Sequence, residues 1–393
     1  MNYYRLTPLE PLVFGDGRPL DRQRGELWPI PATVAAALNV RADEVASDPG
    51  EGAKLEDVRK ALPDSALWGP LLYDPTEGLL LPPPADMLTM EAPTSAIVQE
   101  KASLTAIRGE LIDGSRLYWP TGQPLPRVLK LPERGPDGTK YRPVEDALPW
   151  ETQLRWAMGQ PLPLLFSPLK KVYKQAPRLH VGIDATKGTA EPGILFRTTG
   201  VSLRPELGYV VGWQGPPILK KGEKEVVIPL GGEGRMARLE SLEGYQPPQP
   251  TAATDALPTR PGFLRLQLLT PGWFQHDPTA PFQPHLPELG LVAMRTDRFR
   301  SFSGWQHRRN PKTGLTEQQP RDVRRGVPGG AGYWYGTTDG KVLSAEQLRD
   351  WIQNLWLQPI EKLNNSLNQR NLPSHLGFGL CLPGYTPFGD ESS

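Results

Sequence analysis

Between residues 225 and 240 the chain reads EVVIPLGGEGRMARLE, a strand-like run followed at once by glycines. Val226 to Leu230 is β-branched and apolar, which is typical of a strand. Glycines permit positive φ and close backbone approach, so amide groups can converge there on an oxyanion, and an arginine can add a bidentate charge. The pattern predicts either a phosphate-binding loop or a plain glycine-rich turn between two strands. The residues concerned are Gly231, Gly232, Gly234 and Arg235.

Common nucleotide-binding and catalytic motifs do not fit this chain. The glycine spacing matches neither GxxxxGK[ST] nor GxGxxG, which argues against a P-loop and a Rossmann site. None of the five histidines lies in HExxH or at metal-ligand spacing, and GxSxG is missing. We therefore predict no catalytic residue, no metal and no cofactor. His180 is interpreted as structural, and His307 remains a candidate general base for RNA cleavage.

A basic stretch runs from Arg295 to Arg325, with nine basic residues against three acidic ones. Phe299, Phe302 and Trp305 interleave with the arginines. Guanidinium groups can contact phosphates while rings stack on bases, so the stretch predicts a single-stranded RNA surface. A solvated loop, or a basic face that docks an acidic protein, is the alternative. The arginines selected as RNA contacts are Arg295, Arg298, Arg300, Arg308 and Arg309.

The overall charge does not indicate a nucleic-acid protein. The net charge of this 393-residue chain is +1, so an RNA surface must be local. The single cysteine, Cys381, excludes an internal disulfide and a cysteine zinc cluster, which fits a reducing cytosol. MNYYRLTPLE has no signal-peptide pattern, and no apolar run reaches membrane-spanning length. We expect a cytoplasmic protein that does not enter a membrane.

The predicted fold is α+β, with two ferredoxin-like (RRM-like) βαββαβ domains in tandem, at 1–219 and 220–393. The glycine-rich loop 230–235 falls in the second. Residues 83–177 are predicted to be an insertion whose many prolines make regular structure unlikely, apart from helical segments at 94–108 and 150–158. Further helices are expected at 31–38 and after Ser344, an N-cap. Alternation in Phe263 to Thr270 predicts a half-buried strand.

Three segments together resemble a known family. They are RLTPLEPLVFGDGRPL at 5–20, LHVGIDATKGTAEPGILFRTTG at 179–200 and the glycine-rich loop. In this order they resemble RAMP proteins, the crRNA-binding subunits of CRISPR effectors, and among these the third subunit of type III-B (Cmr) complexes. One departure is Gly15, which stands where the family usually carries a basic residue.

The resemblance implies a non-catalytic RNA-binding subunit of a ribonucleoprotein. It would cap the 5′ handle of the crRNA and join the large polymerase-cyclase subunit to the backbone RAMP subunits. Residues 178–200 would form a hairpin projecting against the guide RNA, with Arg18, Arg178, Lys187 and Arg197 as further contacts. Two alternatives stay open: a metal-independent endoribonuclease that processes CRISPR transcripts, with His307 as its base, and a scaffold for an acidic protein.

Overall fold

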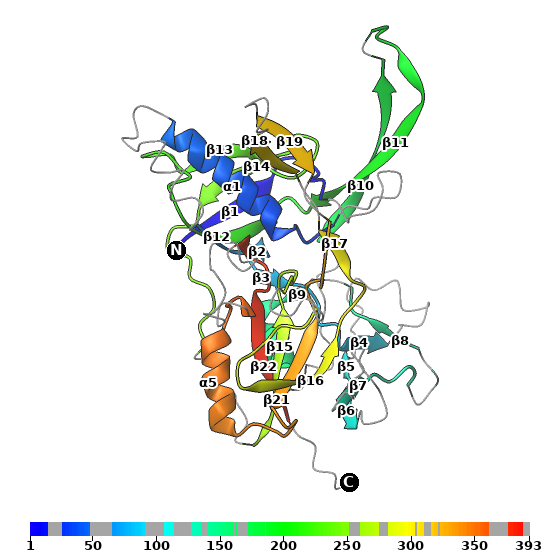
Figure 1. The fold of residues 1–393 in the computed structure, drawn as a ribbon, viewed down its shortest axis with the longest axis vertical. Helices are drawn as coiled ribbons and strands as arrows, with labels where there is room; N and C mark the ends of the chain where they lie inside the picture. Colours follow the sequence, from blue (N-terminus) through cyan, green and yellow to red (C-terminus); the bar gives the residue numbers. More distant parts are fainter. Residues whose placement is uncertain are drawn as a thin grey trace.

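The computed structural model describes residues 1–14, 26–47, 65–90, 106–113, 127–135, 138, 140–145, 147–160, 162, 172–184, 186–250, 260–274, 282–302, 305–309, 316–320, 323–360 and 376–387. It shows a mixed α/β protein with antiparallel sheets and few helices (Figure 1). A seven-stranded sheet and a four-stranded sheet form its two halves, and a long hairpin projects from the first half. None of the helices in these ranges has the length and apolar character needed to cross a bilayer.

The seven-stranded sheet surrounds the N-terminal strand. β1 pairs with β12 on one side and with β14 on the other, so it lies inside the sheet rather than at an edge. The order is β13-β14-β1-β12-β2-β3-β9. The bounds are β1 Asn2–Pro8, β2 Ala66–Asp74, β3 Gly78–Leu81, β9 Leu148–Pro149, β12 Gly208–Gln214, β13 Glu225–Pro229 and β14 Met236–Ser241.

Helix α1, Pro31–Ala46, packs on this sheet and is longer than predicted. Its start at Pro31 is confirmed, because proline is tolerated in the first turn. The predicted end at Leu38 is wrong. Arg41 is buried, its Nε donates to the carbonyl of Ile218 at 3.1 Å, and its Nη2 pairs with Glu223 at 2.5 Å. These tertiary contacts stabilise the helix beyond the end that the sequence predicts.

The second sheet has the order β16-β21-β15-β22 and carries helix α5. Its strands are β15 Gly262–Leu268, β16 Leu289–Arg295, β21 Gly332–Thr337 and β22 Cys381–Pro387. α5 spans Ala345–Leu355, and the predicted N-cap at Ser344 is confirmed. Ser344 Oγ accepts from the amide of Gln347 at 3.2 Å, and the Gln347 side chain accepts from the Ser344 amide at 2.9 Å. This reciprocal capping box satisfies two backbone amides at the start of the helix.

The insertion contains more regular structure than its prolines predict. β4 Met87–Met90, β5 Ala106–Arg108 and β8 Tyr141–Pro143 form one small sheet, and β6 Glu110–Asp113 pairs with β7 Arg127–Lys130. The predicted helix at 150–158 is confirmed as α3, Trp150–Ala157. The helix predicted at 94–108 is wrong at 106–108, which is strand, and its earlier residues lie outside the described ranges.

β15 is buried on both faces, so the half-buried strand predicted from its alternation is wrong. Arg265, on its polar face, is fully buried and binds Asp86 of the insertion at 2.6 Å. Gln267, two residues on, donates to the carbonyl of Pro82 at 2.9 Å, and Gln153 of α3 donates to the same carbonyl at 2.7 Å. The insertion therefore covers the face of the sheet that carries Arg265 and Gln267. In a unit made only of one sheet and the helices on its other face, these two side chains would be exposed to solvent.

The sheets correct the predicted boundary at residue 220. β13 and β14, assigned by sequence to the second unit, belong to the first sheet because β14 pairs with β1. One apolar core also contains residues of both sheets, among them Trp68, Val210 and Leu264. The two halves consequently share buried surface instead of being joined by a linker.

Candidate nucleic-acid interface

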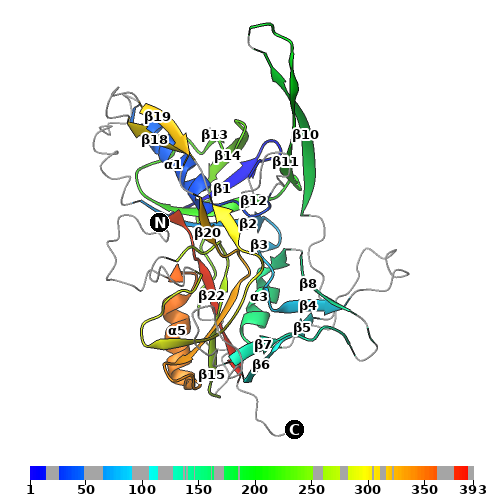
Figure 2. The same cartoon turned by 45° about the vertical axis from the view of Figure 1, so that its right-hand side comes forward.

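A long two-stranded hairpin projects from the body of the molecule, as Figures 1 and 2 show. Its strands are β10, Tyr173–Ile183, and β11, Ala190–Leu203. The hairpin predicted at 178–200 is thus confirmed, with both strands extending further toward the body. Leu179 lies opposite Arg197 and His180 lies opposite Phe196, so each pair shares one face of the ribbon.

The predicted cations of the hairpin are accessible. Arg197 is exposed on β11, and Lys187, at the turn, is 75% exposed and 4.0 Å from Asp184. Arg178, nearer the body, keeps a 3.9 Å contact with Glu10 and is half-exposed. On the face of Arg197, four large aliphatic side chains are exposed as well: Leu179, Val181, Ile183 and Leu195.

The three segments that resemble RAMP proteins meet at the base of this hairpin. Leu12 and Val201 exchange backbone hydrogen bonds of 2.9 and 2.7 Å, which join the first segment to β11. The amide of Gly232 donates to the carbonyl of Val13 at 2.9 Å, which joins the glycine-rich loop to the first segment. Gly231 has φ +84°, and a Cβ there would lie 2.9 Å from the same carbonyl. Glycine is required at 231 both by conformation and by space.

Arg235 does not have the free guanidinium that a phosphate contact needs. Its side chain is only 9% exposed, and it donates to Glu10 at 2.6 Å and to Glu233 at 2.7 Å. The hydrogen bonds that Arg235 donates to these two carboxylates raise the pKa of Arg235, and the pKa of Glu10 is lowered chiefly by the hydrogen bond it accepts from Arg235. The direct phosphate contact predicted for Arg235 is therefore replaced by an internal bridge between the first segment and the loop.

Glu233 and His180 connect the loop to the hairpin. His180 Nε2 lies 2.8 Å from Thr198 Oγ1 and 3.5 Å from a carboxylate oxygen of Glu233, and its ring stacks on Phe196. Burial raises the pKa of Glu233, but hydrogen bonds from Arg235 and Thr198 and the nearby His180 outweigh that effect and lower it. Glu233 holds these contacts at φ +59°, a conformation that few non-glycine residues adopt. These contacts agree with the structural interpretation of His180.

The basic stretch forms two short two-stranded ribbons. β17, Arg300–Phe302, pairs with β20, Arg324–Gly326, and β18, Trp305–Arg309, pairs with β19, Thr316–Pro320. Arg300 forms an ion pair with Glu26, and Arg324 lies 4.7 Å above the ring of Trp273. Arg298 is exposed, whereas Arg295 is half-buried and its Nε has no partner among the described atoms.

Several predicted residues cannot be placed at a site. Arg18 lies outside the described residues, as does the turn around it. The side chains of Trp305, His307, Arg308 and Arg309 are also outside the described part, although their backbone forms β18. Phe302 was predicted to stack on bases, and this is wrong, because it is 6% exposed and packs edge-on against Phe378.

Sequence reasoning missed the carboxylates that organise this region. Glu10, Glu233 and Glu26 each bind an arginine that had been selected as an RNA contact. The signal available in the sequence was the acidic residue inside the glycine-rich loop itself. Within the described ranges, no three histidine, cysteine or carboxylate side chains are grouped so that they could hold a metal ion.

Comparison with solved structures finds chains of similar length and low sequence identity. The type III-B Cmr-beta complex bound to cognate target RNA contains a chain with 14% identity and a TM-score of 0.46, over 98% of this chain and 99% of that one. In the same complex with target RNA and AMPPnP, a chain has 15% identity and a TM-score of 0.45. The match covers 90% of this chain and 88% of that one. A chain of the Csm3–Csm4 subcomplex of the type III-A CRISPR-Cas interference complex has 9% identity and a TM-score of 0.33. The match covers 86% of this chain and 94% of that one.

None of the curated proteins matches the chain. The model of the CRISPR-associated protein (Cas_Cmr3) family, in contrast, matches residues 4–386. That range includes the hairpin, the glycine-rich loop and the segment preceding Gly15, which carry the resemblance seen in the sequence. The chain therefore belongs to the CRISPR-associated Cas_Cmr3 family.

Proposed function

We propose that this protein is a non-catalytic RNA-binding subunit that caps the 5′ handle of the crRNA in a type III-B ribonucleoprotein. In this role it joins the large polymerase-cyclase subunit to the backbone RAMP subunits, in the cytoplasm, as part of antiviral defence. The observation that carries the proposal is the meeting of three segments at the base of a projecting hairpin that bears exposed cations. Such a base fixes the direction in which the cations point.

Two groups of residues have different roles in this proposal. Arg178, Lys187, Arg197 and Arg298 are accessible and would contact phosphates directly, with Arg18, Arg308 and Arg309 as further contacts. The second group would shape and support the surface instead, through the loop's close packing on Val13 and through ion pairs. It comprises Gly231, Gly232, Gly234, Arg235, Arg295 and Arg300.

The bridging role is supported by the apolar side of the hairpin. Leu179 is 70% exposed and Leu195 is 64% exposed, on a ribbon that has no sheet beneath its outer half. Exposed aliphatic side chains that adjoin one another mark surfaces that a partner covers. We further propose that the two sheets are divergent ferredoxin-like units, the second divided from the first after β14.

The proposal is tested by RNA binding of the purified full-length chain. Two guide RNAs of equal length are compared, one beginning with the native 5′ handle and one with the handle scrambled. We expect tighter binding of the native handle, intact RNA after incubation with magnesium or EDTA, and co-precipitation of the large subunit. Equal affinity for both RNAs would contradict handle capping, and specific cleavage would support the endoribonuclease alternative.

A further inference from the structure

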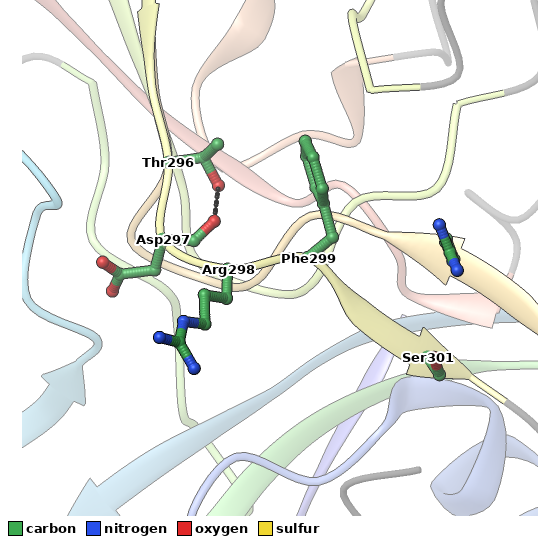
Figure 3. Close-up of a pocket in the computed structure, with 6 residues that line it drawn as sticks. Thr296, Asp297, Arg298, Phe299 and Ser301 are labelled. Carbon is green, nitrogen blue, oxygen red and sulfur yellow. Dashed lines mark hydrogen bonds between the residues drawn. The ribbon is translucent and has the colours of Figure 1, made fainter. Parts of the chain in front are cut away.

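A cleft opens beside the β17–β20 ribbon (Figure 3). Its volume is about 660 Å³, within the ~300–1,000 Å³ range of small-ligand pockets. The chain that leads from β16 into β17 forms one wall, and β20 contributes the other. The lining residues are Thr296, Asp297, Arg298, Phe299, Ser301 and Arg325.

An aromatic platform forms part of this cleft. The rings of Phe299 and Phe282 stack with centroids 3.8 Å apart and an angle of 17°. Phe282 covers one face of Phe299, yet 47% of Phe299 remains exposed. The backbone of Phe282 is fixed in place, because the hydroxyl of buried Tyr333 donates to the carbonyl of Phe282 at 2.9 Å. The exposed part of Phe299 is therefore available to a further flat ring system.

Two guanidinium groups complement the platform. Arg298 immediately precedes Phe299 and is exposed, and Arg325 is exposed on β20. Ser301 and Arg325 are directly opposite in the β17–β20 register, so their side chains share one face of the ribbon. Asp297 is the single acidic residue of the lining, which leaves an excess of positive charge around an exposed ring.

We infer that this cleft binds one nucleotide of single-stranded RNA, with its base stacked on Phe299 and its phosphates against Arg298 and Arg325. The inference rests on the proposed function, which it deepens by assigning one nucleotide to one site. Each nucleotide of a single strand presents a flat base next to an anionic phosphate, which matches a cleft lined by one exposed ring and two arginines. A protein partner would match the ring but has no comparable need for two guanidinium groups.

The test measures affinity of the full-length chain for single-stranded RNA and for the same RNA with one base at a time removed. Phe299→Leu keeps apolar packing on Phe282 but removes the ring, and should weaken binding roughly tenfold, the effect of one lost base stack. Phe299→Trp should bind like the parent. The parent should lose affinity at one particular abasic position, and Phe299→Leu should be insensitive to that position.

Two control variants remove the same kinds of side chain, one apolar and one arginine, at exposed positions outside the lining of the cleft. Val323→Ala changes an exposed apolar residue next to β20, and Arg349→Gln removes an exposed charge from α5. Neither should alter affinity, whereas Arg298→Gln should lower it severalfold. Thermal melts establish that every variant is folded.

Three results would overturn the inference and can be told apart. If the parent does not bind RNA, the proposed function fails and this inference fails with it. If the parent binds but Phe299→Leu and Arg298→Gln bind equally well, only the nucleotide site is wrong. If Phe299→Leu keeps its RNA affinity but no longer captures the large or backbone subunits, the cleft is a protein interface.

Discussion

The guanidinium of Arg235 lies 2.6 Å from the carboxylate of Glu10, a residue 225 positions earlier in the chain. A second carboxylate, that of Glu233, lies 2.7 Å from the same guanidinium. The first segment of the chain and the glycine-rich loop are thus joined by one arginine that pairs with two carboxylates. Because Glu233 also contacts His180, this bridge extends to the hairpin.

The bridge predicts an acid-sensitive contribution to stability. The pKa values of Glu10 and Glu233 are lowered in the folded protein from the ordinary value of 4.5. A lowered folded-state pKa means that the stabilisation is complete above about pH 4.5 and is lost as the pH falls through the lower, folded-state pKa values. Arg235→Gln should lower the melting temperature at pH 7 by a few degrees. When the pH is lowered from 5 to 3, the melting temperature of this variant should decrease less than that of the parent. Identical pH profiles would show that the bridge contributes nothing.

The glycines of the loop should differ in their tolerance of a methyl group. Gly231→Ala places a Cβ 2.9 Å from the carbonyl of Val13 at φ +84° and should cost at least the ~1–2 kcal/mol of a left-handed conformation. In Gly232→Ala the nearest atom is at 3.5 Å, without positive φ, so stability should change by less than about 0.5 kcal/mol. Denaturant unfolding of both variants measures the difference. Equal losses would show that the loop packs differently on Val13.

The buried ion pair of the second half should be far more sensitive than a surface pair. Asp86 is 1% exposed and accepts from Arg265 at 2.6 and 3.3 Å, with the part-buried Arg108 nearby. Asp86→Ala leaves buried arginine charge uncompensated and should cost about 3–5 kcal/mol. Asp339→Ala, which breaks an exposed pair with Lys341, is the matched control and should leave the melting temperature unchanged. Similar effects of both variants would contradict the burial of Asp86.

The hairpin cations should determine the salt dependence of RNA binding. Arg197 is exposed, and its loss in Arg197→Gln should make the plot of log affinity against log salt shallower by about 0.7, the value for one phosphate on a single strand. Arg204, which directly follows the same strand, is already paired with Asp74. Arg204→Gln removes an equal charge and should leave the slope unchanged. If both slopes stay at the parental value, the RNA lies elsewhere.

Local elements and the family could be predicted from the sequence because their signals are local. Ser344 and Gln347 are three residues apart, and the strand at 226–230 and the hairpin are contiguous patterns. The burial of Arg265 could not be predicted, because its partner Asp86 lies 179 positions away in an insertion that looked irregular. The pairing of Arg235 with Glu10 was missed for the same reason. The sequence around an arginine does not show that a carboxylate far away in the chain forms an ion pair with it.

The place of β1 within the first sheet has a consequence for synthesis on the ribosome. Its partners are β12 and β14, and Arg5 forms an ion pair with Glu240, 235 positions later. At about 5–20 residues per second, the emerging N-terminal strand would wait on the order of 10–50 s for its neighbours. For that period Tyr4 and Leu6, buried in the finished protein, have no sheet to cover them. Slow translation should therefore lower the soluble yield, unless a chaperone holds the nascent chain until residue 241 has emerged.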